Sequence, residues 1–129
     1  MARIGSATDV VRKWIEAMNA RDLVGMSALY AAHVVGDEVA NPPLLDRERL
    51  EESYRELFES FPNCHSEVVN VFAGRGQVAA EIRWTGTNEH PFRGVPATNR
   101  RTDLRIAYLF KVVAGKIERI AEYYDTAQI

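Results

Sequence analysis

Residues 103–125 read DLRIAYLFKVVAGKIERIAEYYD, and this stretch decides the fold class. Its first part alternates apolar residues at even positions with a second set that includes Asp103, Arg105 and Lys111. A period of two residues is typical of a β-strand with one buried face. Ala114-Gly115 then predicts a tight turn into a last strand over residues 116–125. The C-terminal part of the chain is therefore predicted to form a β-hairpin.

The same period extends upstream and predicts a second hairpin. An alternating segment begins at Glu67, the run Gly74-Arg75-Gly76 favours a turn, and one face of the next strand is apolar: Val78, Ala80, Ile82 and Trp84. A loop of turn-forming residues, 88–99, leads to the last two strands.

The N-terminal half shows a helical period instead. A stripe of one helix comprises Val11, Trp14, Ile15 and Met18, and a stripe of a later helix comprises Leu50, Tyr54, Leu57, Phe58 and Phe61, which Pro62 ends. Ser6, Asp22 and Asp46 are placed to cap the starts of three helices. Between the second and third helices, residues 33–45 hold a short strand and then Asn41-Pro42-Pro43, which cannot lie inside a helix.

Amphipathic helices followed by hairpin-linked strands predict an α+β fold in one domain, residues 1–129. A strongly twisted sheet of this length cannot stay flat. We expect a cone-shaped barrel, with the N-terminal helices packed on a curved, mostly antiparallel sheet and a pocket at the wide end.

Composition restricts the class of partner. The chain has 16 basic and 18 acidic residues and a net charge of −2, so it has no general attraction for nucleic acid or an anionic membrane. No apolar run approaches the roughly 18 residues of a membrane span, and the N-terminus does not resemble a signal peptide. The single cysteine, Cys64, excludes an internal disulfide. We expect a cytoplasmic protein.

The sequence lacks the common motifs that bind cofactors. It contains neither a phosphate-binding loop nor a dinucleotide fingerprint. Its three histidines are scattered, and a closed metal site needs three or four ligands. We therefore expect no cofactor and no metal.

Three residues are candidates for acid–base chemistry. Glu122 shares a strand face with Ile120 and Tyr124, and such apolar neighbours raise the pKa of a carboxyl group by desolvation. The alternative places Glu122 on the outer, solvated face. Asp37 is a second carboxylate or a turn residue, and Tyr108 is a hydrogen-bond donor for a developing oxyanion or a core residue.

Large side chains predict the pocket wall. The candidates for substrate binding are Trp14, Tyr54, Phe58, Trp84 and Phe110. Sequence alone does not separate wall from core for Trp84 and Phe110. Arg83 faces the other side of its strand from Trp84.

Four motifs in order resemble those of SnoaL-like proteins. GVPATNRR at 94–101 resembles G-x-P-x-[TS]-x-[RK]-R, and AGKI at 114–117 stands where those proteins carry D-G-K-I. FPN at 61–63 resembles F-P-D, and VAAEIRWTGT at 78–87 resembles their V-A-x-R-W-x-x-x-G-T strand. The order and spacing match from about Val11 to Asp125.

The resemblance implies a cone-shaped cavity, often in a homodimer packed through the sheet, and a hydrophobic small-molecule ligand. SnoaL-like polyketide cyclases close a ring by intramolecular aldol condensation without metal or cofactor. Their catalytic carboxylate, an aspartate on the last strand, corresponds to Glu122, and their histidine and glutamine on the preceding strand correspond to Tyr108 and Ile106. The related ketosteroid isomerases place their base in the strand after the second helix, which implicates Asp37.

Three functions follow as hypotheses. The first is cyclase- or isomerase-like proton transfer by Glu122, assisted by Asp37, with Tyr108 binding the oxygen that becomes negative. The second is epoxide hydrolysis, which needs two carboxylates and an arginine; Arg83 would serve only if it pointed inward. The third is a non-catalytic domain that binds an apolar ligand.

Overall fold

The computed structural model describes residues 5–128 and has the α+β fold expected from the sequence. The elements in chain order are α1 (Gly5–Asn19), α2 (Leu23–Ser27), β1 (Tyr30–Glu38), α3 (Arg47–Ser60), β2 (His65–Gly74), β3 (Gln77–Thr87), β4 (Arg101–Val113), β5 (Lys116–Tyr123) and the 3-10 turn η1 (Thr126–Gln128).

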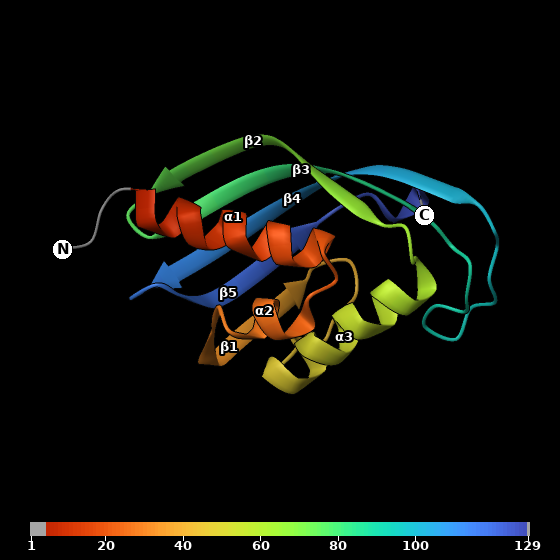
Figure 1. Ribbon diagram of the computed structural model, residues 1–129, viewed down its shortest axis with the longest axis horizontal. Helices are drawn as coiled ribbons and strands as arrows, with labels where there is room; N and C mark the ends of the chain where they lie inside the picture. Colours follow the sequence, from red (N-terminus) through yellow and green to blue (C-terminus); the bar gives the residue numbers. More distant parts are fainter. Residues whose placement is uncertain (1–4, 129) are drawn as a thin grey trace.

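One curved, five-stranded sheet organises the molecule. The strand order is β1-β5-β4-β3-β2, in which β1 runs parallel to β5 and all other neighbours are antiparallel. Figure 1 shows the sheet bending over α1, with α2 and α3 on the same side. Because β1 and β2 are separate edges, hydrogen bonds do not close the sheet, and the fold is a cone open along one side rather than a complete barrel.

Two tight turns confirm the predicted hairpins. The β2–β3 turn places Arg75 and Gly76 at φ 50° and 76°, and the β4–β5 turn places Ala114 and Gly115 at φ 50° and 76°. Two consecutive residues with positive φ match the right-handed twist of the flanking strands, and glycine adopts such angles without steric cost.

Two of the three predicted helix caps are present. Asp22 and Asp46 each accept a hydrogen bond through Oδ1, from the backbone nitrogens of Gly25 and Arg49 at 2.9 Å. The prediction for Ser6 was wrong: α1 already includes Gly5, so Ser6 lies inside the helix. The caps fix where α2 and α3 begin.

The core lies between α1 and the concave face of the sheet. Trp14 is fully buried and packs edge to face on Tyr54, Tyr108 and Phe110, with ring centroids 5.4–5.5 Å apart. Its Nε1 donates a hydrogen bond to the hydroxyl of Tyr30 at 3.1 Å. The apolar rows predicted for β3 and β4 all face this core. This aromatic cluster joins α1 and α3 to the concave face of the sheet.

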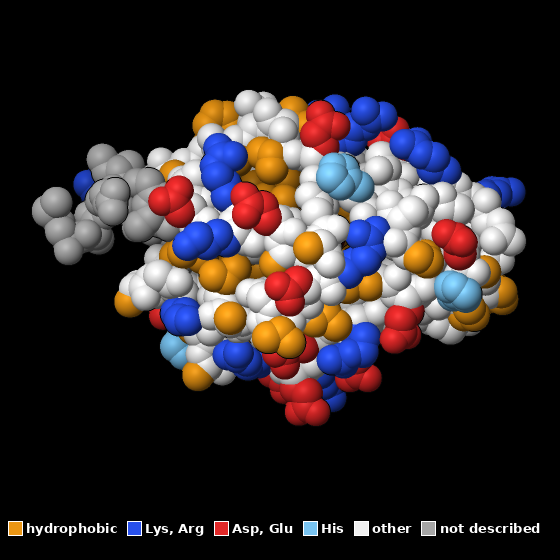
Figure 2. Space-filling model, in the orientation of Figure 1, with side chains coloured by type: hydrophobic (Ala, Val, Ile, Leu, Met, Phe, Trp, Pro, Cys, Tyr) orange, Lys and Arg blue, Asp and Glu red, His pale blue; other side chains and the backbone are white. Residues whose placement is uncertain are grey.

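The surface agrees with the balanced composition. Figure 2 shows basic and acidic side chains interspersed over the face that carries the helices. Within residues 5–128, no helix is both long enough and apolar enough to cross a membrane.

Candidate functional site

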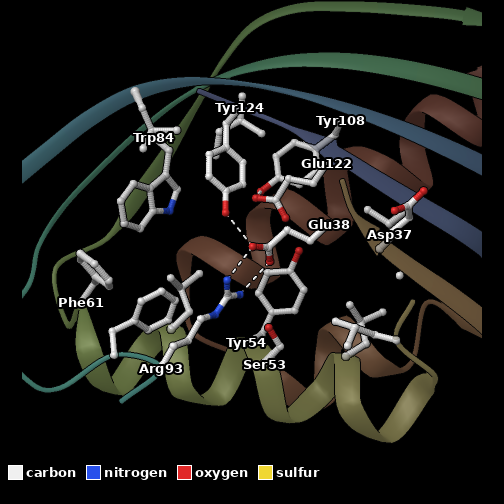
Figure 3. Close-up of a pocket in the computed structure, with 18 of the residues that line it drawn as sticks. Asp37, Glu38, Ser53, Tyr54, Phe61, Trp84, Arg93, Tyr108, Glu122 and Tyr124 are labelled. Atoms are coloured by element: carbon white, nitrogen blue, oxygen red, sulfur yellow. Dashed lines mark hydrogen bonds and ion pairs between the residues drawn. The ribbon is translucent and has the colours of Figure 1, made fainter. Parts of the chain in front are cut away.

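A pocket opens between the concave face of the sheet and α3 (Figure 3). Most of its wall is apolar, and its polar groups gather near one end, where β1, β5 and β4 lie side by side. The lining residues are Gly36, Asp37, Glu38, Leu45, Leu50, Ser53, Tyr54, Leu57, Phe61, Trp84, Phe92, Arg93, Thr102, Leu104, Ile106, Tyr108, Ile120, Glu122 and Tyr124.

Strand register brings three polar side chains into one row. Glu38 on β1 is the register partner of Glu122 on β5, and Glu122 is in turn the partner of Tyr108 on β4. Neighbouring strands lie about 4.8 Å apart, and register partners point to the same face. Two carboxyl groups and a phenol therefore meet in the pocket, although they are far apart in the sequence.

Glu122 lies in an environment that disfavours its charge. Burial raises its pKa to about 8, and the nearby negative charge of Glu38 acts in the same direction. The hydroxyl of Tyr108 lies 3.4 Å from its Oε1 and donates a long hydrogen bond. The side chain keeps some accessible surface because it borders the pocket. Near neutral pH, Glu122 can therefore both lose and regain a proton.

Glu38 has the opposite character. Arg93 donates to its two carboxylate oxygens from Nη1 and Nη2 at 2.6 and 2.7 Å, and the Tyr124 hydroxyl donates at 2.6 Å. Burial raises the pKa of Glu38, but the hydrogen bonds from Arg93 and Tyr124 outweigh it, so the net pKa lies below its usual value. Glu38 is thus a fixed negative charge beside Glu122.

A short turn brings Arg93 to the pocket. Phe92 and Val95 exchange backbone hydrogen bonds at 2.9 Å, and Arg93 and Gly94 between them have φ 51° and 77°. The guanidinium carbon lies 4.8 Å from the centroid of the Phe92 ring, which is a cation–π contact. At the start of the same loop, the Ser60 hydroxyl donates to the backbone oxygen of Pro91 at 2.7 Å. The loop between β3 and β4 is therefore attached to the end of α3.

Tyr54 completes the polar end of the pocket. It projects from α3, and in Figure 3 its hydroxyl points toward the two carboxyl groups. Burial, together with the proximity of Tyr108 and Glu122, raises its pKa well above the usual range. Burial and the nearby Glu122 raise the pKa of Tyr108 in the same way, so both phenols stay protonated and are available as hydrogen-bond donors.

The structure separates the predicted site residues into two groups. Glu122, Tyr108, Tyr54 and Trp84 line the pocket, as does Asp37. Asp37, however, forms an ion pair with Arg119, and Figure 3 shows it apart from the acidic pair. The three remaining aromatic residues were predicted to line the pocket but are buried in the core behind its wall: Trp14, Phe58 and Phe110.

Two central residues were not predicted as site residues. Glu38 adjoins Asp37 in the sequence, and only strand register shows which of the two carboxylates faces Glu122. Arg93 lies in the loop of turn-forming residues, directly before the GVPATNRR motif, and neither pattern indicates where its side chain points. The arginine considered earlier, Arg83, lies on the outer face and binds Asp103 with an Nη2–Oδ2 distance of 2.6 Å. Across residues 5–128, no group of three or more His, Cys, Asp or Glu is arranged to hold a metal ion.

Helices packed in the hollow of a curved, open sheet are the arrangement of the ketosteroid isomerase-like fold. One solved structure described by that fold, from Catenulispora acidiphila in complex with trimethylamine, aligns with a TM-score of 0.80 at 16% identity over 94% of this chain and 88% of that chain.

The family assignment is more specific. The SnoaL-like domain family matches residues 11–120, so the chain belongs to this family. A proposed SnoaL-like polyketide cyclase from Jannaschia sp. aligns with a TM-score of 0.89 at 20% identity, covering 98% of this chain and 91% of that one. A proposed polyketide cyclase from Xanthomonas campestris aligns with a TM-score of 0.86 at 25% identity, covering 98% of both chains. No curated protein matches the sequence.

Proposed function

We propose that the protein is a cofactor-independent enzyme that transfers protons on an apolar carbonyl compound, in a cyclase- or isomerase-like reaction. The observation that carries this proposal is the row of Glu122, Tyr108 and Glu38 within an otherwise apolar pocket. Membership of the SnoaL-like family and the likeness to proposed polyketide cyclases support it.

The chemistry assigned to Glu122 is removal and return of one proton. Its carboxylate form takes a proton from the carbon next to a substrate carbonyl, and the C–H electron pair forms an enolate. Tyr108 and Tyr54 donate hydrogen bonds to the enolate oxygen. In a cyclisation the enolate carbon attacks a second carbonyl of the same molecule, a C–C bond forms, and Glu122 returns the proton to the new alkoxide oxygen. In an isomerisation Glu122 returns the proton to a different carbon of a conjugated enolate. The product is an isomer of the substrate in either case.

A raised pKa suits this role. A carboxylate whose conjugate acid has a pKa of about 8 is a stronger base than an ordinary glutamate, and its acid form still exists at neutral pH. Glu38 remains ionised because Arg93 and Tyr124 hold it, so its charge keeps the pKa of Glu122 high. In this proposal Glu38, rather than Asp37, is the assisting carboxylate.

Deuterium exchange tests the proposal without knowledge of the natural substrate. Apolar cyclic ketones and β-keto esters are incubated with the protein in D2O, and deuterium incorporation is followed by mass spectrometry. We expect exchange in the wild type, and a loss of about 100-fold or more in Glu122→Gln. Asp37→Asn is the matched control, because its carboxylate is paired with Arg119. Equal exchange in wild type and Glu122→Gln would overturn the proposal, and binding without exchange would favour a non-catalytic ligand-binding domain.

Epoxide hydrolysis is the second candidate, and Arg93 is the observation that favours it. Two of the carboxyl groups in the pocket, those of Glu38 and Glu122, are neighbours, and Arg93 binds the first of them. In that reaction, protonated Glu122 donates to the epoxide oxygen while ionised Glu38 activates water. The two candidates predict opposite pH profiles: kcat/KM rises toward a plateau above about pH 8 for enolisation and falls above about pH 8 for hydrolysis. Labelled water enters the product only in hydrolysis.

A homodimer through the outer face of the sheet is also proposed. Phe72, Ala79 and Leu109 are register neighbours on that face, and Phe72 and Leu109 are exposed. Light scattering of wild type and Phe72→Glu measures the oligomeric state; a wild-type monomer would contradict this part of the proposal.

A further inference from the structure

Trp84 presents an unpaired hydrogen-bond donor to the pocket. Its side chain lies toward the apolar end, and the residue is only 6% exposed. Among residues 5–128 its indole nitrogen has no hydrogen-bond partner, and the only completely enclosed side-chain nitrogen or oxygen without a partner is Ser66 Oγ. The Trp84 nitrogen therefore keeps contact with the open space of the pocket. In Figure 3 it is on the side of the ring that faces Tyr124.

This arrangement is unusual for a buried tryptophan. An indole N–H nearly always finds a partner when it is buried, because an unpaired donor costs about 1–3 kcal/mol. Trp14 in the same protein follows the rule, with its Nε1 bound to the Tyr30 hydroxyl at 3.1 Å. Trp84 lacks such a partner because the wall around its ring, which includes Phe61 and Leu104, is largely apolar.

The neighbouring residues hold the Trp84 ring in one position. Phe61 packs edge to face on it, with ring centroids 5.1 Å apart. Gly86 leaves room for the ring, because a Cβ at that position would lie 3.0 Å from Trp84 Cη2. The direction of the N–H is therefore fixed before any ligand arrives, which lowers the entropy cost of binding to it.

We propose that the indole N–H of Trp84 binds an acceptor oxygen of the substrate and so determines specificity. The substrate class is then narrower than the proposed function alone requires: an uncharged, mostly apolar molecule with two oxygen functions. One is the carbonyl that reacts at Glu122, and the other is a carbonyl or ether oxygen that accepts from Trp84. The assignment of the reacting end rests on the proposed function, whereas the donor at Trp84 does not.

Strand register gives the approximate distance between Trp84 and Glu122. Leu104 is the partner of Trp84 and Tyr108 is the partner of Glu122, so the two points lie four residues apart along β4 and two strands apart across the sheet. This places the Cα atoms on the order of 15 Å apart. Because both side chains extend into the pocket, the distance between their polar groups is shorter than the distance between the Cα atoms. It suits a molecule of about two fused rings.

Two small probes of the same shape test the donor directly. Acetophenone carries a carbonyl oxygen, and α-methylstyrene carries a CH2 group in its place. Each is titrated into 15N-labelled protein, whose two tryptophans give two indole N–H signals. The Trp14 signal is assigned by its contact with Tyr30, and the remaining indole signal belongs to Trp84.

We expect acetophenone to move the Trp84 indole proton downfield and saturably, α-methylstyrene to leave it nearly in place, and the Trp14 signal to stay constant with both. Trp84→Phe keeps an aromatic ring without the donor, and should weaken acetophenone binding about 3- to 10-fold while changing α-methylstyrene binding by less than about 2-fold. Equal responses to both probes, or no response of Trp84, would overturn the proposal. If Trp84→Phe does not fold, the comparison of the two probes in the wild type decides alone.

The same titration in Glu122→Gln separates this proposal from the proposed function. We expect the Trp84 response to persist in this variant, because it depends on a different part of the pocket. Loss of deuterium exchange with an intact Trp84 response supports both proposals. Exchange that survives the substitution overturns only the function assigned to Glu122, and a silent Trp84 signal in an actively exchanging wild type overturns only the donor.

Discussion

Replacing Glu122 with glutamine should stabilise the protein at alkaline pH and not at acidic pH. The folded-state pKa of Glu122 is raised by burial to about 8, from an ordinary value of 4.5. Below pH 4.5 the group is neutral in both folded and unfolded chains. Between pH 4.5 and 8 the unfolded chain loses its proton while the folded chain keeps it, so the free energy of unfolding falls as pH rises. Glutamine has no proton to lose and avoids this decrease.

The size of the effect follows from the shift in pKa. At 1.36 kcal/mol for each pH unit, a rise from 4.5 to about 8 sets an upper limit of about 5 kcal/mol. Glu122 borders the pocket and meets solvent there, so we expect roughly half of this limit to be observed. About 2 kcal/mol corresponds to a Tm difference of roughly 6–10 °C in a domain of this size.

Thermal and urea unfolding of both proteins between pH 4.5 and 9 measure this difference. The amide also alters the hydrogen bond with Tyr108, which adds a constant offset, so the growth of the gap with pH is the decisive quantity. Glu52→Gln, an exposed position on α3, controls for the loss of a glutamate in general. A gap that stays constant from pH 4.5 to 9 would refute the argument that the pocket disfavours the charge of Glu122.

Three further substitutions test other contacts. Arg93→Met leaves the carboxylate of Glu38 without its cation, so urea unfolding should show a free energy of unfolding lower by about 1–3 kcal/mol. The double variant with Glu38→Gln should recover most of this stability, and a double variant that recovers none of it contradicts the pairing. Gly86→Ala should displace the Trp84 ring, cost about 1–3 kcal/mol and shift the tryptophan fluorescence, whereas an unchanged spectrum argues against tight packing there. Asp37→Asn should change stability by less than about 1 kcal/mol and leave the pH profile of deuterium exchange in place; a displaced profile would return Asp37 to the site.

The sequence located the residues whose positions depend on local alternation. Tyr108 lies on β4, where burial alternates without interruption, so the period of two assigns its face directly. In β5 the register shifts opposite Lys111 and Val112, so a period counted from Ile117 would turn Glu122 outward, whereas a period counted from Ile120 turns it inward. Burial of Ile120 beside Glu122 confirms the face chosen for the last strand. These two side chains could be placed because the residues directly beside them, in particular Ile120 and Phe110, keep the period of two.

The second carboxylate could not be assigned in the same way. The pairing of β1 with β5 joins residues more than eighty positions apart, and the register shifts between Tyr30 and Val35. A shift of this kind reverses which residues face inward. The local sequence pattern therefore could not show whether Asp37 or Glu38 points toward Glu122. Arg93 was missed for a related reason: its role depends on where a loop lies against α3, which no period encodes.

The core aromatics illustrate a different limit. Trp14 and Phe110 sit on apolar stripes that predict burial correctly, but burial in a core and burial in a pocket wall leave the same periodicity. What separates them is whether a side chain borders the open space of the pocket, which Trp14 and Phe110 do not and Tyr108 does. That difference arises from the curvature of the whole sheet.

The raised pKa of Glu122 depends in part on the fixed negative charge of Glu38 beside it. Arg93 and Tyr124 satisfy Glu38 so fully that its negative charge persists even where burial opposes it. Glu122 has only one long hydrogen bond from Tyr108, and the neighbouring charge and the apolar wall both act against its ionisation. Two glutamates on adjacent strands thus differ in proton affinity because one has a cation and the other has none. Removing Arg93 should therefore change the pH profile in two ways, because Arg93 keeps Glu38 ionised and its charge also lowers the pKa of Glu122 directly.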